Sequence, residues 1–350
     1  MQAIWNEKLT SPKHHAYAAV RIAIDLKLFE IISKPTSLDE IVQKTDADPV
    51  ILQRILRAVS SIGYVKQTAA TQWEPSPLTP VLNAPSIHDW LIAHFDERMV
   101  IAGRFPEWLK KRGYKNTGSI DDCVFKEVTG EQCWGFYDNH PEASAIFDSA
   151  MSIQESFPKE TLPPYPFLGD VGELHTDSDA VTLIDIGGGF GQAIKKLRAD
   201  YPSVKGRFIL QDLPKTINQI DVTQAKRDGF EPTAHDFFKS QPIKGAKYYH
   251  LRRVLHDWND GPSIKILEAT RDAMKYTPNY SRLLIHEACL PDVGCGFVEA
   301  MIDIMMMQVC DGMERTESQW HELLGKTGFK IVKIWRADVG PTAVIEAVVA

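Results

Sequence analysis

The chain has 350 residues, of which 44% are hydrophobic, so it is long enough to bury a full core and to divide into two domains. Its 39 lysines and arginines are outnumbered by 46 aspartates and glutamates, which gives a formal net charge of -7. This acidic balance argues against nucleic acid or anionic lipid as a partner, because both are bound through a surplus of positive charge.

The cysteines and the first residues indicate the compartment. The five cysteines are odd in number and form no C-x-x-C pair, so we expect neither a zinc site nor a disulfide framework. The start, MQAIWNEKLTSPKHH, lacks the basic residues and apolar centre of a signal peptide, and no run reaches the roughly 18 apolar residues of a membrane span. We therefore expect a cytoplasmic protein with no membrane partner.

The first part of the chain has helical patterns. Residues 16 to 32, AYAAVRIAIDLKLFEII, predict an apolar helix. In SLDEIVQK, Ser37 and Glu40 have the spacing of a capping box, in which each side chain satisfies a backbone amide near the other residue, so a helix starts there. Residues 134 to 151, WGFYDNHPEASAIFDSAM, predict a further helical stretch.

A second helix and a β-hairpin complete a winged-helix pattern. In DPVILQRILRAVSSIG, Asp48 is the expected N-cap, Pro49 takes the first helical position and Gly63 ends the helix. The following YVKQTAATQWEPS has two short β-like pieces around a turn of small residues. Because residues 37 to 75 carry few basic side chains within an acidic chain, we expect a packing or dimerisation module rather than a DNA reader.

A proline-rich segment at residues 157 to 172, FPKETLPPYPFLGDVG, separates two kinds of pattern. We therefore predict two domains, residues 1 to 160 and 161 to 350. The second has apolar strands separated by helices, in the order VTLIDI, RFILQ, KYYHL, RLLIHE, KIVKIWR and TAVIEAVV. This order is typical of a doubly wound α/β fold with a parallel sheet. The last two strands are joined by the short ADVGP loop and should pair antiparallel.

The turn after the first of these strands, LIDIGGGFGQA, is rich in glycine. Gly187 and Gly189 have no side chains, so a ligand can approach the backbone amides of the turn. The dinucleotide fingerprint G-x-G-x-x-G needs a third glycine where this chain has Gln192, which disfavours a nicotinamide dehydrogenase.

Three carboxylates near strand ends indicate an adenosine ligand. Asp212, in RFILQDLP, stands where an acidic residue accepts both ribose hydroxyls in doubly wound folds, although it is also placed to cap a turn before Pro214. Asp236 and Phe237 offer a carboxylate for an adenine amino group and a ring for its face, or else a turn and a core residue. Asp185 holds either a ligand's amino group or a loop amide.

A histidine in YYHLRRVLHDWND is the candidate base. Alone, His256 is more often a core imidazole, because tuning of a base needs partners. Glu287, in RLLIHEACLPD, ends the next sheet strand, and Glu314 lies in the loop of CDGMERTESQW. The carboxyl ends of parallel strands share one edge of the sheet, so His256 and Glu287 should meet there with Glu314 in reach. HEACL lacks the second histidine of H-E-x-x-H, so we expect no metal.

With LIDIGGGFG, QDLP, HDFF, LRRVLHDW, HEACLPD and GMERT in this order, the sequence resembles the plant-type and fungal O-methyltransferases of the caffeic-acid and flavonoid O-methyltransferase family. The resemblance covers nearly the whole chain. It implies a Rossmann-like methyltransferase domain that follows a mostly helical winged-helix dimerisation domain. It also implies a homodimer that uses S-adenosylmethionine (SAM), releases S-adenosylhomocysteine (SAH) and methylates a hydroxyl of a small aromatic or polyketide-type secondary metabolite.

The resemblance also implies roles for single residues. His256 is the general base, and Glu287 and Glu314 flank it. For the methyl donor we predict contacts from Asp185, Gly187, Gly189, Asp212, Asp236, Phe237 and Arg252. The plant members usually have Lys at the position of Arg252, so Arg253 competes for that role.

For the acceptor, the resemblance implies an aromatic and sulfur-rich clamp. The predicted contacts are Phe147, Met151, Met305, Met306 and Asp257. Methionine sulfur packs flexibly on aromatic rings, although residues 298 to 309 have the spacing of a buried core helix as well.

Two alternatives to methyl transfer stay open at this point. Some fungal relatives with this architecture are pericyclases or other non-methylating catalysts, often with altered catalytic residues, whereas this chain keeps His256, Glu287 and Glu314. A winged-helix, ligand-sensing regulator is the second alternative, and the acidic charge disfavours it.

Overall fold

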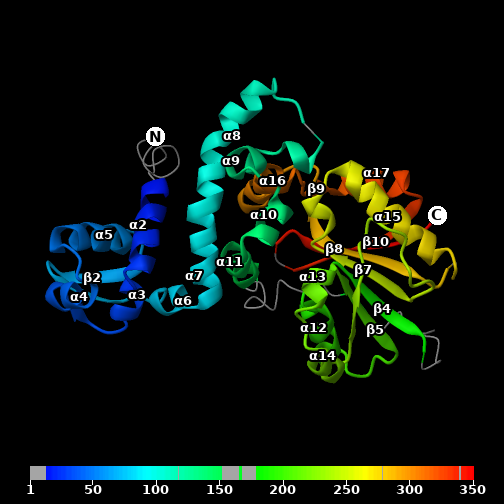
Figure 1. Ribbon diagram of the computed structural model, residues 1–350, viewed down its shortest axis with the longest axis horizontal. Helices are drawn as coiled ribbons and strands as arrows, with labels where there is room; N and C mark the ends of the chain where they lie inside the picture. The colour runs from blue at the N-terminus through cyan, green and yellow to red at the C-terminus, as the bar shows by residue number, and fades with distance from the viewer. Residues whose placement is uncertain (1–12, 117, 152–164, 168–178, 278, 339) are drawn as a thin grey trace. The chain divides into compact units, whose positions relative to one another are not determined.

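The computed structural model describes residues 13–116, 118–151, 165–167, 179–277, 279–338 and 340–350 (Figure 1). The chain divides into two compact units, Met1–Pro106 with Trp134–Ser156, and Glu107–Cys133 with Phe157–Ala350. This division differs from a single boundary near residue 160, because residues 107–133 join the second unit. Most of the proline-rich linker lies outside the described residues.

The first unit contains the winged helix. Its elements are α2 (Lys13–Asp25), α3 (Leu28–Ile31), β1 (Thr36–Ser37), α4 (Leu38–Thr45), α5 (Pro49–Ser61), β2 (Val65–Ala69), β3 (Gln72–Pro75), α6 (Thr79–Leu82), α7 (Pro85–Ala93), a π-helical turn (His94–Arg98), the first part of α8 (Met99–Lys111), α10 (Cys133–Asn139) and α11 (Pro141–Met151). The antiparallel strands have the order β1-β3-β2, which confirms the predicted wing.

Local signals fix the starts of α4 and α5. The Ser37 side chain accepts the Glu40 amide, and Glu40 accepts the Ser37 amide in return, so the predicted capping box is confirmed. Asp48 accepts from the amides of the first turn of α5, and Gly63 follows the helix end with φ 82°. Trp73 of β3 and the inner face of α5 are fully buried in one core.

The prediction of one continuous helix over residues 16 to 32 was wrong. Lys27 takes a left-handed backbone conformation with φ 53°, which separates α2 from α3. Leu28 and Phe29, just after the break, are buried, so tertiary packing overrides the helical pattern of the sequence. The stretch of residues 134 to 151 is likewise two helices, α10 and α11, because Pro141 begins a new one.

The second unit is a doubly wound sheet with helices on both faces (Figure 1). Its strand order is β10-β11-β8-β7-β4-β5-β6, and β9 pairs with the end of β8. The elements are α9 (Val124–Thr129), β4 (Val181–Ile186), α12 (Gln192–Asp200), β5 (Arg207–Asp212), α13 (Pro214–Ile217), α14 (Val222–Asp228), β6 (Glu231–Ala234), β7 (Tyr248–Arg252), α15 (Asp260–Met274), β8 (Arg282–Leu290), α16 (Phe297–Cys310), β9 (Arg315–Thr316), α17 (Glu317–Lys326), β10 (Phe329–Arg336) and β11 (Thr342–Val349).

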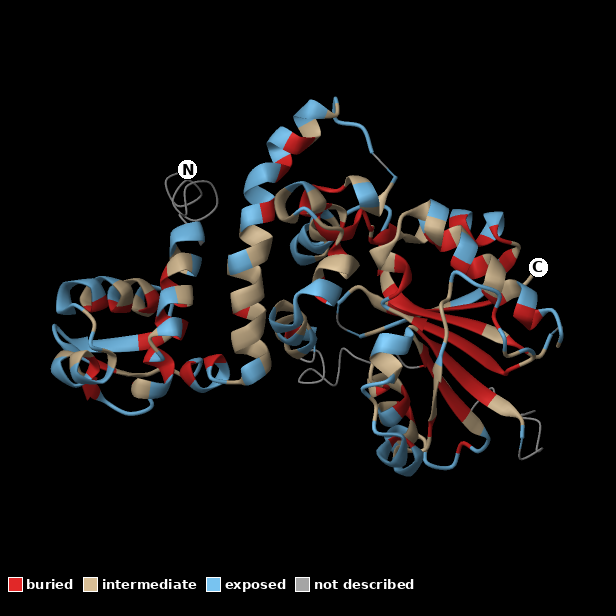
Figure 2. Cartoon of the chain, viewed as in Figure 1, coloured by how far each residue is buried: buried red, intermediate tan, exposed pale blue. Residues whose placement is uncertain are grey.

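The direction of the strands places the site. β4 to β8 run parallel, so their carboxyl ends lie at one edge of the sheet, whereas β10 and β11 pair antiparallel as predicted. The inner strands β4, β5, β7, β8 and β11 are mostly buried, the edge strands β6 and β10 are partly exposed, and the helices expose their outer faces (Figure 2). Among the described residues, none of the helices combines the length and apolar character needed to cross a membrane.

Candidate active site

The glycine turn after β4 is shaped for a ligand. Gly187, Gly189 and Gly191 all have left-handed φ values, of 69°, 59° and 80°. A Cβ atom at Gly187 would lie 2.9 Å from the Val254 side chain, and one at Gly191 would lie 2.9 Å from the Phe230 ring. At Gly189 a Cβ atom would meet only one atom within 4 Å, at 3.8 Å, so the backbone there faces open space.

Asp212, at the end of β5, is bonded to this turn. One of its carboxylate oxygens accepts the Gly189 amide at 2.9 Å, and the other accepts the Leu213 amide at 2.8 Å. Burial raises the pKa of Asp212, while these two amides act in the opposite direction. A carboxylate oxygen can accept two hydrogen bonds, so Asp212 can accept two ribose hydroxyls in addition to these two amides.

Asp185 lies beneath the turn. Its Oδ1 atom is 2.8 Å from His250 Nδ1, and the Asp185 side chain is fully buried. A Cβ atom at Gly188 would lie 2.4 Å from Asp185 Oδ2, which has no hydrogen-bond partner among the described residues. This placement favours support of the turn from below over direct contact with a ligand.

Phe237 and Asp236 follow β6 on the same edge of the sheet. The Phe237 ring lies 3.5 Å from the Cβ position of Gly187, so ring and glycine turn adjoin. Asp236 accepts the Phe238 amide at 3.0 Å, which is turn chemistry. Arg252 ends β7 half-buried, whereas Arg253 is exposed with a left-handed φ of 52°. The structure therefore brings Phe237 to the glycine turn.

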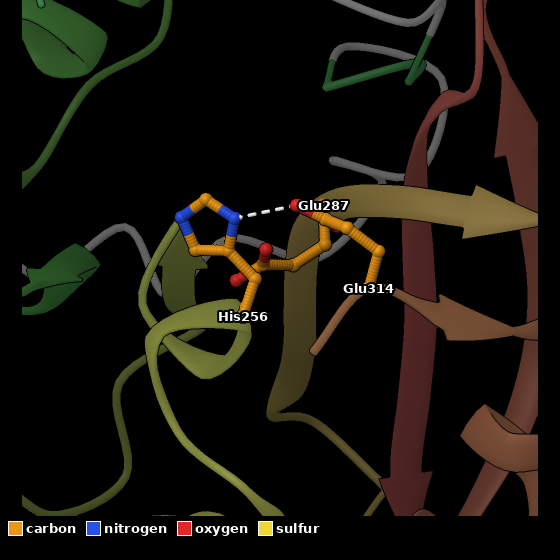
Figure 3. A group of neighbouring side chains, drawn as sticks. All are labelled: His256, Glu287 and Glu314. Carbon is orange, nitrogen blue, oxygen red and sulfur yellow. Dashed lines mark hydrogen bonds and ion pairs between the residues drawn. The ribbon is translucent and has the colours of Figure 1, made fainter. Parts of the chain in front are cut away.

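His256, Glu287 and Glu314 meet as the sequence predicts. His256 lies in a 3₁₀ turn (Leu255–Asp257) after β7, and its Nδ1 atom is 2.8 Å from Glu314 Oε1. One potential ligand atom from each of the three side chains lies within 4.8 Å of the others. Figure 3 shows the other ring nitrogen of His256 on the side away from both glutamates. The imidazole is 17% exposed, so it is not turned into the core.

Glu287 has a second task. Its Oε1 atom accepts the backbone amides of Val254 and Leu255, each at 2.9 Å, and so holds the turn that carries His256. Glu287 Oε2 is buried and has no hydrogen-bond partner among the described residues. The carboxylate therefore both anchors the turn and places negative charge behind the imidazole.

The acids decide the charge of His256. Burial is the largest single influence and lowers its pKa, but Asp257, Glu287 and Glu314 together raise that pKa to about 10. Burial also raises the pKa of Asp257, to about 7. The Asp257 Oδ1 atom lies 3.5 Å from His256 Nε2, beside the nitrogen that Glu314 leaves available. This environment strongly stabilises the imidazolium, which is the form that His256 takes after it has accepted a proton as a base.

The residues predicted for the acceptor fall into both units. Met305 and Met306 lie on α16, which contacts the turn of His256, and Met306 is buried. Phe147 and Met151 lie on α11 in the first unit, where Phe147 stacks on Tyr137 with ring centroids 4.5 Å apart. The acceptor-binding role of all four remains a prediction.

The sequence reasoning missed two buried polar residues beside the site. His250 lies on β7, where Tyr248, His250 and Arg252 alternate along one face, and this two-residue period was a usable signal. Arg315, directly after Glu314, is fully buried. No pattern of the sequence singled it out, because its partners lie in a loop more than fifty residues away.

The side chains and backbone around the glycine turn fit SAM. The open backbone at Gly189, the carboxylate of Asp212 and the ring of Phe237 offer surfaces for a sulfonium nucleoside's amino-acid end, ribose and adenine. All three lie at the carboxyl edge of the parallel strands, the same edge as His256.

Comparisons with known proteins agree with this geometry. Residues 111–330 match the family model of the O-methyltransferase domain, and residues 11–82 match that of the O-methyltransferase dimerisation domain. The demethylsterigmatocystin 6-O-methyltransferase of Aspergillus flavus is 33% identical over 336 residues, which cover 95% of this chain and 84% of that protein.

Solved structures match over the whole chain. OxaC in complex with SAH and oxaline has a TM-score of 0.85 at 28% identity and covers 100% of this chain and 89% of its own. A structure described as a pericyclic reaction enzyme has a TM-score of 0.88 at 26% identity and covers 100% of this chain and 92% of its own. The family models and the relatives together show that this chain belongs to the SAM-dependent O-methyltransferase family.

Proposed function

We propose that this enzyme methylates a phenolic or enolic hydroxyl of a small aromatic or polyketide-type secondary metabolite, with His256 as the general base. The observation that carries the proposal is the 2.8 Å contact between His256 Nδ1 and Glu314 at the edge of the sheet that holds the glycine turn. A relative that is a 6-O-methyltransferase of demethylsterigmatocystin supports the acceptor class.

The protein's part in the reaction is to position the acceptor and to remove one proton. When bound, SAM supplies a methyl group that its sulfonium already activates. With Nδ1–H donating to Glu314, Nε2 of a neutral His256 is the atom that accepts the hydroxyl proton. Glu314, Glu287 and Asp257 then stabilise the imidazolium, whose pKa of about 10 matches that of a phenol.

The remaining predicted residues have binding roles in this proposal. Gly187, Gly189, Asp212, Asp236, Phe237 and Arg252 hold the donor. Asp185, which His250 holds at 2.8 Å, packs directly against Gly188 of the turn. The predicted contacts of the acceptor are Met305, Met306 and Asp257 in the second unit and Phe147 and Met151 in the first. The match of residues 11–82 to a dimerisation domain supports a homodimer.

A screen of acceptors tests the function. The enzyme is incubated with SAM and a panel of hydroxylated polyketides and phenolics, and mass spectrometry follows the gain of one methyl group and the formation of SAH. His256→Ala should lower kcat by about 10²- to 10⁴-fold while SAM affinity, measured by calorimetry, stays unchanged. His321→Ala, an exposed histidine of α17, is the control and should retain full activity. Full turnover by His256→Ala would refute the role of His256.

A non-methylating reaction is the second candidate, and the similarity to a pericyclic reaction enzyme favours its inclusion. The same screen separates the two functions, because a rearranged product keeps its mass and leaves SAM unconsumed. The presence of the base His256 with both glutamates favours methylation.

A further inference from the structure

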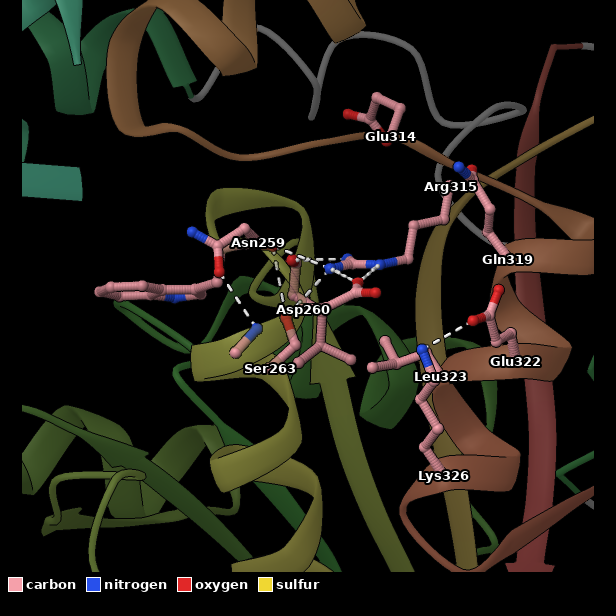
Figure 4. Close-up of polar contacts among 12 residues, drawn as sticks. Asn259, Asp260, Ser263, Glu314, Arg315, Gln319, Glu322, Leu323 and Lys326 are labelled. Carbon is pink, nitrogen blue, oxygen red and sulfur yellow. Dashed lines mark hydrogen bonds and ion pairs between the residues drawn. The ribbon is translucent and has the colours of Figure 1, made fainter. Parts of the chain in front are cut away.

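Arg315 is a fully buried cation beside the candidate base. Its Nε and Nη2 atoms both donate to Asp260 Oδ1, at 3.1 and 2.9 Å, and Nη2 also lies 3.2 Å from Ser263 Oγ (Figure 4). The guanidinium carbon of Arg315 is 5.3 Å from the centre of the Trp320 ring. A buried charge is strongly destabilising unless its donors are satisfied, and here the acid, the hydroxyl and the backbone carbonyls satisfy the guanidinium.

Two further bonds of Arg315 go to the turn that carries His256. Nη1 donates to the Leu255 carbonyl at 3.0 Å, and Nη2 donates to the Trp258 carbonyl at 2.9 Å. These two carbonyls flank His256 in the chain. Glu287 accepts the Leu255 amide, so the backbone of the turn is held both through an amide and through two carbonyls.

The loop that precedes Arg315 is fastened to the same turn. The Met313 amide donates to the His256 carbonyl at 2.9 Å, and Asn259 donates to Asp311 at 2.9 Å. Glu314 therefore bonds His256 from a loop in which the following residue, Arg315, is hydrogen-bonded to the turn that carries His256. The 2.8 Å bond between the two side chains depends on the relative position of these loops.

We propose that Arg315 is a positioning residue for methyl transfer, and that its planar fork of donors fixes the His256 turn against the loop of Glu314. The proposal rests on the proposed role of His256 as the base. Lysine keeps the charge but concentrates three donors on one nitrogen, so it cannot reach Leu255, Trp258 and Asp260 in one plane.

The test compares Arg315→Lys with Arg271→Lys. Arg271 is a matched control in the same unit, because it also bonds a backbone carbonyl, that of Thr327 at 2.8 Å, but lies outside the site. We expect Arg315→Lys to lower kcat by about 10- to 100-fold with SAM affinity unchanged, and Arg271→Lys to alter stability only. Asp260→Ala, which removes one partner and keeps Arg315, should give a smaller loss of kcat in the same direction.

Histidine NMR supplies a readout that does not need turnover. The ring signals of His256 should titrate below the wild-type pKa of about 10 in Arg315→Lys, because Glu314 is no longer held against Nδ1 while Asp257 and Glu287 remain. Arg271→Lys should titrate as the wild type does.

A wild-type kcat and a wild-type His256 titration in Arg315→Lys would overturn the proposal. If that variant does not fold, Asp260→Ala decides in the same way. A wild-type enzyme that methylates no acceptor would refute the proposed function instead, and the NMR comparison would still show whether Arg315 positions His256.

Discussion

At the scale of single residues, His256 experiences two opposed influences. Burial favours the neutral imidazole, whereas Asp257, Glu287 and Glu314 favour the imidazolium and raise its pKa to about 10. The imidazolium is therefore the main form near neutral pH. A base must be unprotonated before it accepts a proton, so only a small fraction of the enzyme is competent at neutral pH.

The rate should accordingly rise with pH. We expect kcat with a phenolic acceptor to increase from about pH 7 and to level off near the His256 pKa of about 10. Glu314→Gln removes one of the three acids, so the pKa of His256 falls and the rising part of the profile moves to lower pH. SAH formation at saturating substrate measures both profiles, and a flat profile for both proteins would contradict this assignment.

The same three side chains raise the question of a metal ion. Their potential ligand atoms lie within 4.8 Å of one another, a spacing that an ion tolerates. However, His256 Nδ1 is engaged by Glu314, and Glu287 Oε1 accepts two backbone amides. We therefore expect methylation to be unchanged after dialysis against EDTA and after addition of Zn²⁺ or Mg²⁺, measured by SAH release. Loss of activity with EDTA and recovery with one metal would contradict this.

At the scale of elements, the site depends on two loops in close contact. A Cβ atom at Gly312 would lie 2.1 Å from the His256 carbonyl oxygen and 3.1 Å from Asp257 Cα. Backbone cannot move aside as a flexible side chain does, so a side chain at position 312 must push the turn of His256 away from the loop of Glu314.

Gly312→Ala should therefore impair the base more than the fold. We expect kcat to fall by about 10- to 100-fold, because a displacement of about 1 Å separates the catalytic groups. Gly325→Ala, in α17, is the matched control, since a Cβ atom at Gly325 would have no neighbouring atom within 4 Å. That variant should keep its activity and gain about 0.5 to 1 kcal/mol of stability from the helix propensity of alanine. Equal activity of the two variants would show that the loops do not need this contact.

Local signals were enough to predict some elements. The starts of α4 and α5 depend on Ser37 and Asp48, whose caps are set within three residues. Apolar runs predicted the central strands, because a strand buried on both faces needs no polar alternation. β6 was not predicted: it is an edge strand with the sequence EPTA, and Pro232 and its polar neighbours lack that signature.

The site was predictable where topology alone brings residues together. Strand ends of a parallel sheet share an edge, which predicts the meeting of His256 and Glu287. Arg315 was not predictable in this way. Its function depends on the carbonyls of Leu255 and Trp258, and backbone groups carry no mark in a sequence.

At the scale of the whole molecule, each unit contains a histidine whose pKa is lowered by burial, His94 being half-buried and His286 buried. Burial lowers the pKa of His94 to about 4 in the first unit, where its ring stacks on Trp90 at 4.0 Å. In the second unit, burial lowers the pKa of His286 well below its ordinary value, and His250, Arg252 and Arg253 act in the same direction. Neither histidine belongs to the proposed reaction.

These histidines make stability depend on pH in a defined direction. In the unfolded chain each binds a proton near pH 6.5, whereas the folded protein keeps each neutral to lower pH. Their contribution is therefore complete above about pH 6.5 and is lost as the pH falls toward the folded pKa, which is about 4 for His94.

We expect each of these two histidines to contribute a decrease in the free energy of unfolding as the pH falls from about 7 to 4, with a slope of up to about 1.4 kcal/mol per pH unit. Asp257, with its pKa raised to about 7, contributes in the opposite direction, so the histidine contributions are measured as differences between each variant and the wild type. His286→Gln and His94→Gln replace a titrating group by a neutral amide, so each should make this dependence less steep. His321→Gln, at an exposed position, should leave it unchanged. Urea unfolding followed by circular dichroism gives the three slopes, and slopes for His286→Gln and His94→Gln as steep as the wild type's would mean that these histidines are protonated in the folded protein.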